Sequence, residues 1–317
     1  MGVNTSIKHG IAEIVLDCPP VNALNSQEWL DLAKNIDFLS HDDEVKVILI
    51  SAAGKGFCAG ADVKELQEDP TKISAVNDGC WKTARAIHVC NVPVISACHG
   101  FVLGGGILLA GASDIVLSTK EAYFGLPEID RGALGGGAHL SRLFPLQAVR
   151  KMMFTGKPIS AQRAYEYGSI ESLHENIDSL HDAAMEIASD IASKSSIAMN
   201  LAKKALNQIE NGNVDEHYKS EQTFTLELYK SKDSLSFDMI ANHIKTNRSK
   251  GVLLATELPT LLIKQKKDTL FIKYDNILLN KEFNPVDKYY FYRIKDTGNN
   301  LLASLDRFDS VGQIDGF

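Results

Sequence analysis

The 317-residue sequence lacks several features that would place it in a specialised class of protein. It contains no run of about 18 apolar residues, so no transmembrane helix is expected. Its first ten residues, MGVNTSIKHG, include no apolar segment of the kind that secretory signal peptides carry. The formal net charge of −7 argues against a general nucleic-acid-binding protein. We therefore expect a cytoplasmic protein that binds neither membranes nor nucleic acid.

Motifs for metals and dinucleotides are also missing. The histidines are scattered without ligand spacing, and no G-x-G-x-x-G with a downstream acidic residue occurs. The cysteines show no C-x-x-C spacing, so we interpret them as reduced thiols in a reducing compartment. We expect no metal and no separate cofactor. The five cysteines are Cys18, Cys58, Cys80, Cys90 and Cys98.

What is present indicates an α/β protein. Residues 5–17 alternate apolar and polar side chains around His9-Gly10, which predicts a β-hairpin. The continuous apolar run at 45–52 is typical of a strand that is buried on both faces, and 93–100 and 114–119 predict further strands. Segments with helical spacing lie between them. Alternating strands and helices favour a largely parallel sheet with right-handed crossovers.

The C-terminal part of the chain has a different character. Residues 160–210 are expected to be mostly helical, with Ser160 as an N-cap. Residues 251–317 alternate at period two and are rich in lysine and aromatic residues. We interpret them as a β-rich or poorly ordered extension. The predicted division is a core at 1–195, a helical region at 196–250 and this extension.

Two turns rich in glycine carry the first functional signal. Gly104–Gly106 precede a predicted helix, whose N-terminal N–H groups are unpaired and carry the positive end of the helix dipole. Without Cβ atoms, this backbone can approach a ligand closely, although tight helix packing is an alternative reason for three glycines. A second turn, GKGFCAGADVKEL at 54–66, also follows a buried strand. Two such turns can each direct one N–H group at a single oxygen, forming an oxyanion hole.

A third stretch, YFGLPEIDRGALGGGAHLSRL at 123–143, supplies acid–base candidates. Glu128 is either a solvated carboxylate of a turn or a general acid–base. Asp130 and Arg131 either form an ion pair that shapes the turn or bind a charged group of a substrate. His139 follows another glycine triplet and either has a structural role or activates a water molecule.

These three stretches, in this order, resemble the crotonase (enoyl-CoA hydratase/isomerase) superfamily. The resemblance covers roughly residues 8–250 and includes PPVNAL, NVPVISACHGFVLGGG and TGKPISAQRAYEYG. It implies repeated ββα units that form two near-perpendicular sheets, followed by a helical trimerisation region. It further implies an acyl-CoA substrate and a homotrimer or a dimer of trimers.

The resemblance also implies roles for individual residues. The N–H groups of Ala61 and Gly105 would form the oxyanion hole, while Glu128 and His139 are the acid–base candidates. Tyr218 and Glu221 lie in the helical region that can close over the acyl group. The residues expected to contact the substrate are Ala59, Asp62, Lys64, Gly104, Leu108, Asp130 and Arg131.

Leu108 departs from the family pattern. Hydratases of this superfamily use two glutamates to hold and split a water molecule, and one of them lies two residues after the glycine triplet. Leucine occupies that place here, whereas Glu128 matches the second glutamate. Leu108 can also be read as an ordinary core residue, but the carboxylate is missing in either case. Hydration of a straight-chain enoyl-CoA is therefore doubtful.

Further similarity narrows the expected reaction. PPVNALNSQEWLDLA, FGLPEIDRGALGGGAHLSRL and EQTFTLEL look like actinobacterial crotonases of sterol-ring catabolism, which open a ring by hydrolysing a carbon–carbon bond. The extension at 251–317 is a departure from that subgroup. The alternatives are an enoyl-CoA hydratase or double-bond isomerase, and a non-catalytic scaffold that binds acyl-CoA.

Overall fold

The structure is a computed structural model, and it describes residues 2–210, 212–230, 252–255, 261–266, 269–274, 289–297 and 300–308. Side chains are described up to residue 226, apart from that of Arg131. The chain divides into two compact units, which we describe separately. The first unit comprises Met1–Asp62 and Val76–Leu228, and the second comprises Val63–Ala75 and Tyr229–Phe317.

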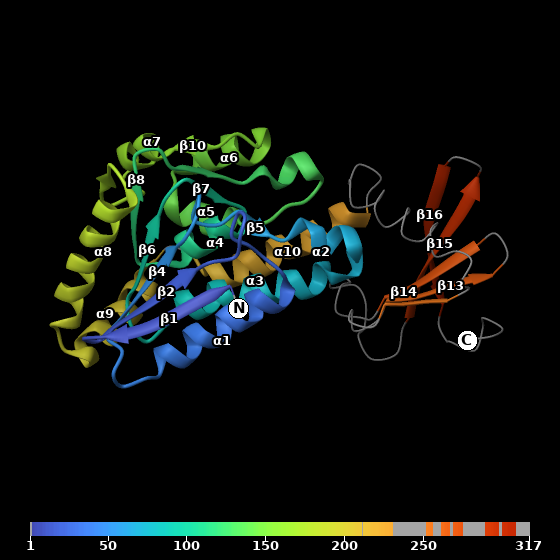
Figure 1. Cartoon of the computed structure of the whole chain (residues 1–317). Helices are drawn as coiled ribbons and strands as arrows, with labels where there is room; N and C mark the ends of the chain where they lie inside the picture. The colour runs from blue at the N-terminus through green and yellow to red at the C-terminus, as the bar shows by residue number, and fades with distance from the viewer. Residues whose placement is uncertain are drawn as a thin grey trace. The chain divides into compact units, whose positions relative to one another are not determined.

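A six-stranded sheet forms the centre of the first unit (Figure 1). Its first two strands form the predicted antiparallel hairpin, which turns at His9 and Gly10 with φ of 53° and 82°. Every later neighbour pairs in parallel, as the alternation of strands and helices predicted. The strand order is β1 (Val3–Lys8), β2 (Ile11–Leu16), β4 (Val47–Ala52), β6 (Val94–Cys98), β8 (Ile115–Thr119) and β11 (Leu173–His174).

Burial of the central strands explains why the sequence reads as continuous apolar runs. Val47 to Ile50 of β4 are completely buried, which confirms the prediction of a strand covered on both faces. One face of the sheet packs against α8 (Ile177–Ala192), which lies along the sheet in Figure 1. Leu180 and Ala184 of this helix contact the buried residues of β4, β6 and β8.

A second, smaller set of strands alternates with the main strands along the sequence and carries the glycine turns. A three-stranded sheet has the order β10 (Ile159–Ser160), β9 (Tyr123–Gly125) and β7 (Phe101–Leu103). A two-stranded parallel pair consists of β3 (Ala23–Leu24) and β5 (Gly60–Ala61). These short strands end at the predicted functional turns.

Helix boundaries follow local capping chemistry. Asn25 and Glu28 form a capping box at the start of α1, and the Ser160 side chain accepts the Arg163 N–H at the start of α7, which confirms the predicted N-cap. None of the described helices is long and apolar enough to cross a bilayer. The other helices that lie wholly or mostly in the first unit are α1 (Ser26–Ser40), α3 (Ile73–His88), α4 (Gly105–Ala112), η2 (Pro127–Arg131), α5 (Gly137–Leu143), α6 (Leu146–Thr155), α7 (Ala161–Glu166), α9 (Ser196–Ile209) and α10 (Val214–Lys230).

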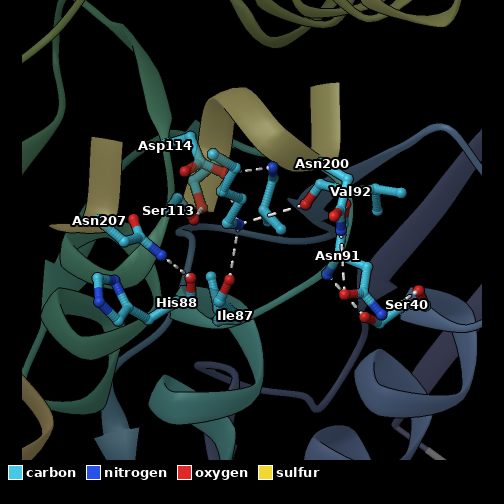
Figure 2. Close-up of polar contacts among 12 residues, drawn as sticks. Ser40, Ile87, His88, Asn91, Val92, Ser113, Asp114, Asn200 and Asn207 are labelled. Carbon is cyan, nitrogen blue, oxygen red and sulfur yellow. Dashed lines mark hydrogen bonds and ion pairs between the residues drawn. The ribbon is translucent and has the colours of Figure 1, made fainter. Parts of the chain in front are cut away.

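Helix α9 contacts the core through polar side chains. The buried ammonium group of Lys203 donates to the carbonyl oxygens of Ile87 and Val92, at 2.9 and 3.2 Å, and to Asp114 Oδ2 at 2.7 Å (Figure 2). Asn200 and Asn207, which flank it on the same helix face, donate to backbone carbonyls of the α3 end and the loop that follows. A buried ammonium is tolerated only with such a set of acceptors, so Lys203 fixes α9 on the core.

We expect Lys203→Met to lower the free energy of unfolding by about 2–3 kcal/mol, because it leaves the Asp114 carboxylate and two carbonyls without their ammonium partner. Urea unfolding followed by circular dichroism measures this loss. Lys204→Met is the matched control, because Lys204 is exposed on the same helix and its loss should cost little. Equal stability of the two variants would show that the buried ion pair contributes nothing.

The second unit contains α2 (Val63–Glu68), η1 (Pro70–Lys72) and an antiparallel sheet in which each strand pairs with the next. Its strands are β12 (Val252–Ala255), β13 (Leu261–Lys266), β14 (Thr269–Tyr274), β15 (Tyr289–Thr297) and β16 (Asn300–Phe308). Part of the predicted helical region, residues 231–250, lies outside the described residues. The predicted boundaries at 195 and 250 stay predictions.

Candidate active site

The two glycine turns that lie far apart in the sequence are adjacent in the structure. The Cys58 N–H donates to the Phe101 carbonyl at 3.2 Å, and the Leu103 N–H donates to the Cys58 carbonyl at 2.9 Å. A Cβ at Gly60 would lie only 2.8 Å from the nitrogen of Gly105. Strand β5 therefore runs past the first turn of α4, with backbone against backbone.

Both predicted N–H donors belong to the segments that meet at this junction. The Asp62 N–H donates to the Leu24 carbonyl at 2.8 Å, so its side of β5 faces β3. Because successive residues of a strand alternate in direction, the N–H of Ala61 points away from β3. Gly105 opens α4, where N–H groups have no partner within the helix and the dipole is positive. The arrangement suits an oxygen that gains negative charge, as an oxyanion hole requires.

Tight packing accounts for the glycine at 105. A Cβ there would lie 2.7 Å from Cη2 of Trp29 and 3.1 Å from Cα of Gly60. Trp29 is completely buried in α1, so it has no room to move aside. In the sequence, Trp29 lies in one of the segments with helical spacing between the predicted strands, and no local signal could reveal that it supports the glycine turn.

Glu128 lies beside the same turn. It belongs to η2, and a Cβ at Gly104 would lie 2.5 Å from its Oε1 atom. Gly104 has a φ of 54°, which favours glycine, and it precedes the first helical residue of α4. The carboxylate is therefore next to the two backbone donors, where a general acid–base is predicted.

Leu108 is a buried residue in an apolar environment. Its side chain is 3% exposed, and a Cβ at Gly136 would lie 3.5 Å from Leu108 Cδ2 and 2.9 Å from Leu126 Cδ2. Leu108 thus faces the loop that follows Glu128. Leu108 is therefore a core residue, as one interpretation of the sequence held. It also leaves the site without the carboxylate that hydratases have at this position, as the other interpretation held.

His139 is buried at the other end of α4. It is 1% exposed, and a Cβ at Gly111 would lie 2.9 Å from His139 Cβ. Its ring meets that of Tyr218 edge to face at 5.0 Å, and neither ring nitrogen has a hydrogen-bond partner among the described residues. Burial lowers the pKa of His139 to about 3, with a smaller contribution from Arg142. His139 is therefore neutral near pH 7 and a weak base.

Helix α10 holds the loop between Glu128 and His139. The Glu221 carboxylate accepts the N–H groups of Gly137 and Ala138, at 2.8 and 3.1 Å, and the Thr225 hydroxyl donates to the Leu134 carbonyl. Burial raises the pKa of Glu221, while the two backbone N–H groups oppose that rise. Glu221 therefore caps α5 and secures the loop that follows the Glu128 turn.

The remaining predicted contact residues are less closely grouped. The Ala59 N–H donates to the Val21 carbonyl at 3.1 Å, which holds the turn before β5 in place. Asp130 lies against Gly156, where a Cβ would be 3.0 Å from its Cγ. Lys64 belongs to α2 in the second unit, and the side chain of Arg131 lies outside the described residues. Their roles in binding stay predictions.

No group of three metal-ligating side chains occurs among the residues for which side chains are described. All five cysteines in this part of the chain are free and buried.

Comparison with known proteins places this site in a family context. The family model described as enoyl-CoA hydratase/isomerase matches residues 6–242. The (7aS)-7a-methyl-1,5-dioxo-2,3,5,6,7,7a-hexahydro-1H-indene-carboxyl-CoA hydrolase of Mycobacterium tuberculosis is 41% identical over 227 residues, covering 71% of this chain and 92% of the relative. The hydrolase of the same name from Rhodococcus jostii is 38% identical over 231 residues, covering 72% of this chain and 89% of the relative.

Solved structures show the same fold. An enoyl-CoA hydratase/isomerase from Xanthobacter autotrophicus Py2 superposes with a TM-score of 0.69 at 26% identity, covering 79% of this chain and 94% of that structure. The part of this chain that the family model matches includes β5, α4 and the Glu128 turn.

Proposed function

The chain belongs to the enoyl-CoA hydratase/isomerase family, and we propose on that basis that it opens the ring of a cyclic keto-acyl-CoA by hydrolysing a carbon–carbon bond. As a member of the crotonase superfamily, with the crotonase fold, it is an enzyme that acts on acyl-CoA thioesters. The observation that carries the ring-opening proposal is the pairing of one carboxylate, Glu128, with the two backbone donors, while Leu108 stands where a hydratase has its other glutamate.

The proposed reaction needs one base and one anion site. Glu128 takes a proton from water as the water oxygen bonds to a ring ketone that is β to the thioester. The carbon–carbon bond then breaks, and its electron pair forms the thioester enolate, whose oxygen is stabilised by the N–H groups of Ala61 and Gly105. Glu128 returns the proton to the α-carbon, so one water is added and a carboxylic acid is formed.

The geometry favours Glu128 over His139 as the base. Glu128 touches the glycine turn, whereas His139 packs against Gly111, almost two helical turns from Gly105. With a pKa of about 3, His139 is also a poor acceptor for a proton of water near neutral pH. No cofactor is needed beyond the coenzyme A that the substrate carries.

Double-bond isomerisation is the second candidate. A single carboxylate can move a proton between two carbons, and a dienoyl-CoA isomerase of Mus musculus is 28% identical over 246 residues. Membership of an enzyme family favours either reaction over a non-catalytic scaffold.

Product analysis by mass spectrometry tests the proposal. The protein is incubated in oxygen-18 water with a cyclic 2-ene-6-oxo acyl-CoA and, separately, with crotonyl-CoA. Ring opening with one heavy oxygen in the new carboxylate is the expected result. Hydration of crotonyl-CoA would instead support the hydratase alternative and would overturn the interpretation of Leu108. A shifted double bond without added water would support the isomerase.

We also propose that the chain assembles as a homotrimer or a dimer of trimers, and α9 supports this. Its inner face is polar, with Asn200, Lys203 and Asn207 bonded to the core. Its exposed surface carries several large apolar side chains alongside Lys204 and Gln208, which departs from the usual pattern of a surface helix. An exposed apolar stripe of this kind marks a protein interface. Its large aliphatic side chains are Ile197, Leu201, Leu206 and Ile209, between 60% and 74% exposed.

The double substitution Ile197→Glu/Leu201→Glu should dissociate the assembly, because it would bury two charges in the proposed interface. Sedimentation velocity measures the mass of the particle. Ser189→Glu on α8 is the control, since it adds a charge at an exposed polar position. A wild-type protein that sediments as a monomer would contradict the proposed assembly.

A further inference from the structure

The thiol of Cys58 has a specific partner in the turn that leads into β5. The Gly60 N–H donates to Cys58 Sγ at 3.3 Å, across two residues and in a buried environment. Cys58 is completely buried, and burial raises the pKa of its thiol to about 12. The sulfur is therefore an uncharged acceptor, and it closes a turn in the way that serine and aspartate side chains do.

This hydrogen bond fixes the orientation of one peptide plane. In a trans peptide, the N–H and the preceding carbonyl point in opposite directions. With the Gly60 N–H directed at the buried sulfur, the Ala59 carbonyl points away from Cys58. The next peptide plane carries the Ala61 N–H, and its direction relative to the first plane depends on the φ and ψ of Gly60, of which φ is 96°. The thiol thus restrains the start of a turn whose end is a proposed oxyanion donor.

The backbone of the same residue joins the two halves of the site. Cys58 forms a parallel bridge with Val102, through the hydrogen bonds to Phe101 and Leu103. A Cβ at Gly106 would lie 2.6 Å from the Cys58 carbonyl oxygen, so the first turn of α4 also rests on this residue. One residue therefore contacts both segments that supply the donors.

We propose that Cys58 is a positioning residue of the oxyanion hole, whose thiol sets the peptide between Ala59 and Gly60 and thereby aims the Ala61 N–H at the thioester oxygen. The proposal rests on the oxyanion hole of the proposed function. It concerns geometry alone, and the thiol takes no part in bond making.

Two substitutions and one control test this role in the full-length protein. Cys58→Ala removes the acceptor, and we expect kcat for the ring-opening substrate to fall about 10-fold with little change in KM, because a misdirected donor is lost chiefly in the transition state. Cys58→Ser keeps an acceptor and should restore most of kcat. Cys98→Ala is the matched control, because Cys98 is equally buried at the end of β6, and it should lower thermal stability but not kcat.

A spectroscopic readout separates this proposal from the proposed function. Butyryl-CoA labelled with carbon-13 at the thioester carbonyl is saturated and unreactive, and hydrogen bonds from the donors lower its carbonyl stretching frequency on binding. Cys58→Ala should lose about half of this downshift, since one of two donors is misdirected, whereas Cys98→Ala should keep it. A full downshift and unchanged kcat in Cys58→Ala would overturn the role of Cys58 alone. No downshift in the wild-type protein would overturn the oxyanion hole itself.

Discussion

Glu128→Gln is expected to lower kcat by about 10³-fold while the affinity for acyl-CoA changes little, because the amide has the shape of the carboxylate but cannot accept the proton of water. Glu128 contacts Gly104 at the start of α4, so an isosteric side chain should leave the glycine turn undisturbed. Steady-state kinetics gives kcat, and isothermal titration with the substrate analogue butyryl-CoA gives the affinity.

Glu121→Gln provides the matched control for this substitution. Glu121 is exposed just before β9, in the same stretch of sequence, and the same chemical change there should leave kcat within a factor of about two. If Glu128→Gln kept most of the wild-type kcat, the base would have to be another group, and the mechanism built on Glu128 would be wrong.

Gly105→Ala should lower kcat/KM by about 10²–10³-fold, which is the loss seen when an oxyanion donor is removed. The added methyl group would lie 2.7 Å from Cη2 of Trp29, so the first turn of α4 must shift away from Trp29 and the Gly105 N–H is displaced. Competition assays with butyryl-CoA separate a loss of binding from a loss of rate.

A second substitution shows whether the steric conflict causes the loss. Trp29→Phe removes the outer ring atoms that the methyl group would meet, so Gly105→Ala/Trp29→Phe should regain part of the activity of the single variant. Gly168→Ala controls for a glycine replacement without a steric clash, because a Cβ there meets no atom within 4 Å. Its φ of 73° disfavours alanine, so this variant should lose some stability but keep kcat/KM. A double variant no better than Gly105→Ala would place the defect elsewhere.

Local patterns in the sequence predicted the strands and helices well. The hairpin at His9-Gly10 and the buried strand β4 follow from the period of apolar residues, and the start of α7 follows from its cap at Ser160. These features depend on neighbouring residues along the chain, which is why they are readable without a structure.

Local sequence patterns could not predict contacts between segments that lie far apart in the chain. Family resemblance proposed that Glu128 serves the glycine turn, but the contact with Gly104 is visible only in the structure. Two other contacts are also visible only in the structure: Trp29 packs against Gly105, and the Gly60 N–H donates to the Cys58 thiol. They depend on how the elements pack, which the sequence patterns do not predict. The helical period also predicted α9, yet not that its polar face would be the buried one.

Main-chain atoms supply both proposed donors, and this determines which amino-acid substitutions should inactivate the protein. No change of side chain can delete the N–H group of Ala61 or Gly105, short of proline. Inactivating substitutions at the junction of β5 and α4 should therefore be those that add atoms, at Gly60, Gly104, Gly105 and Gly106, where a Cβ would meet neighbours within 3 Å. In a saturation-mutagenesis map, we expect these glycines to reject even alanine, while exposed acidic positions such as Glu121 accept most replacements.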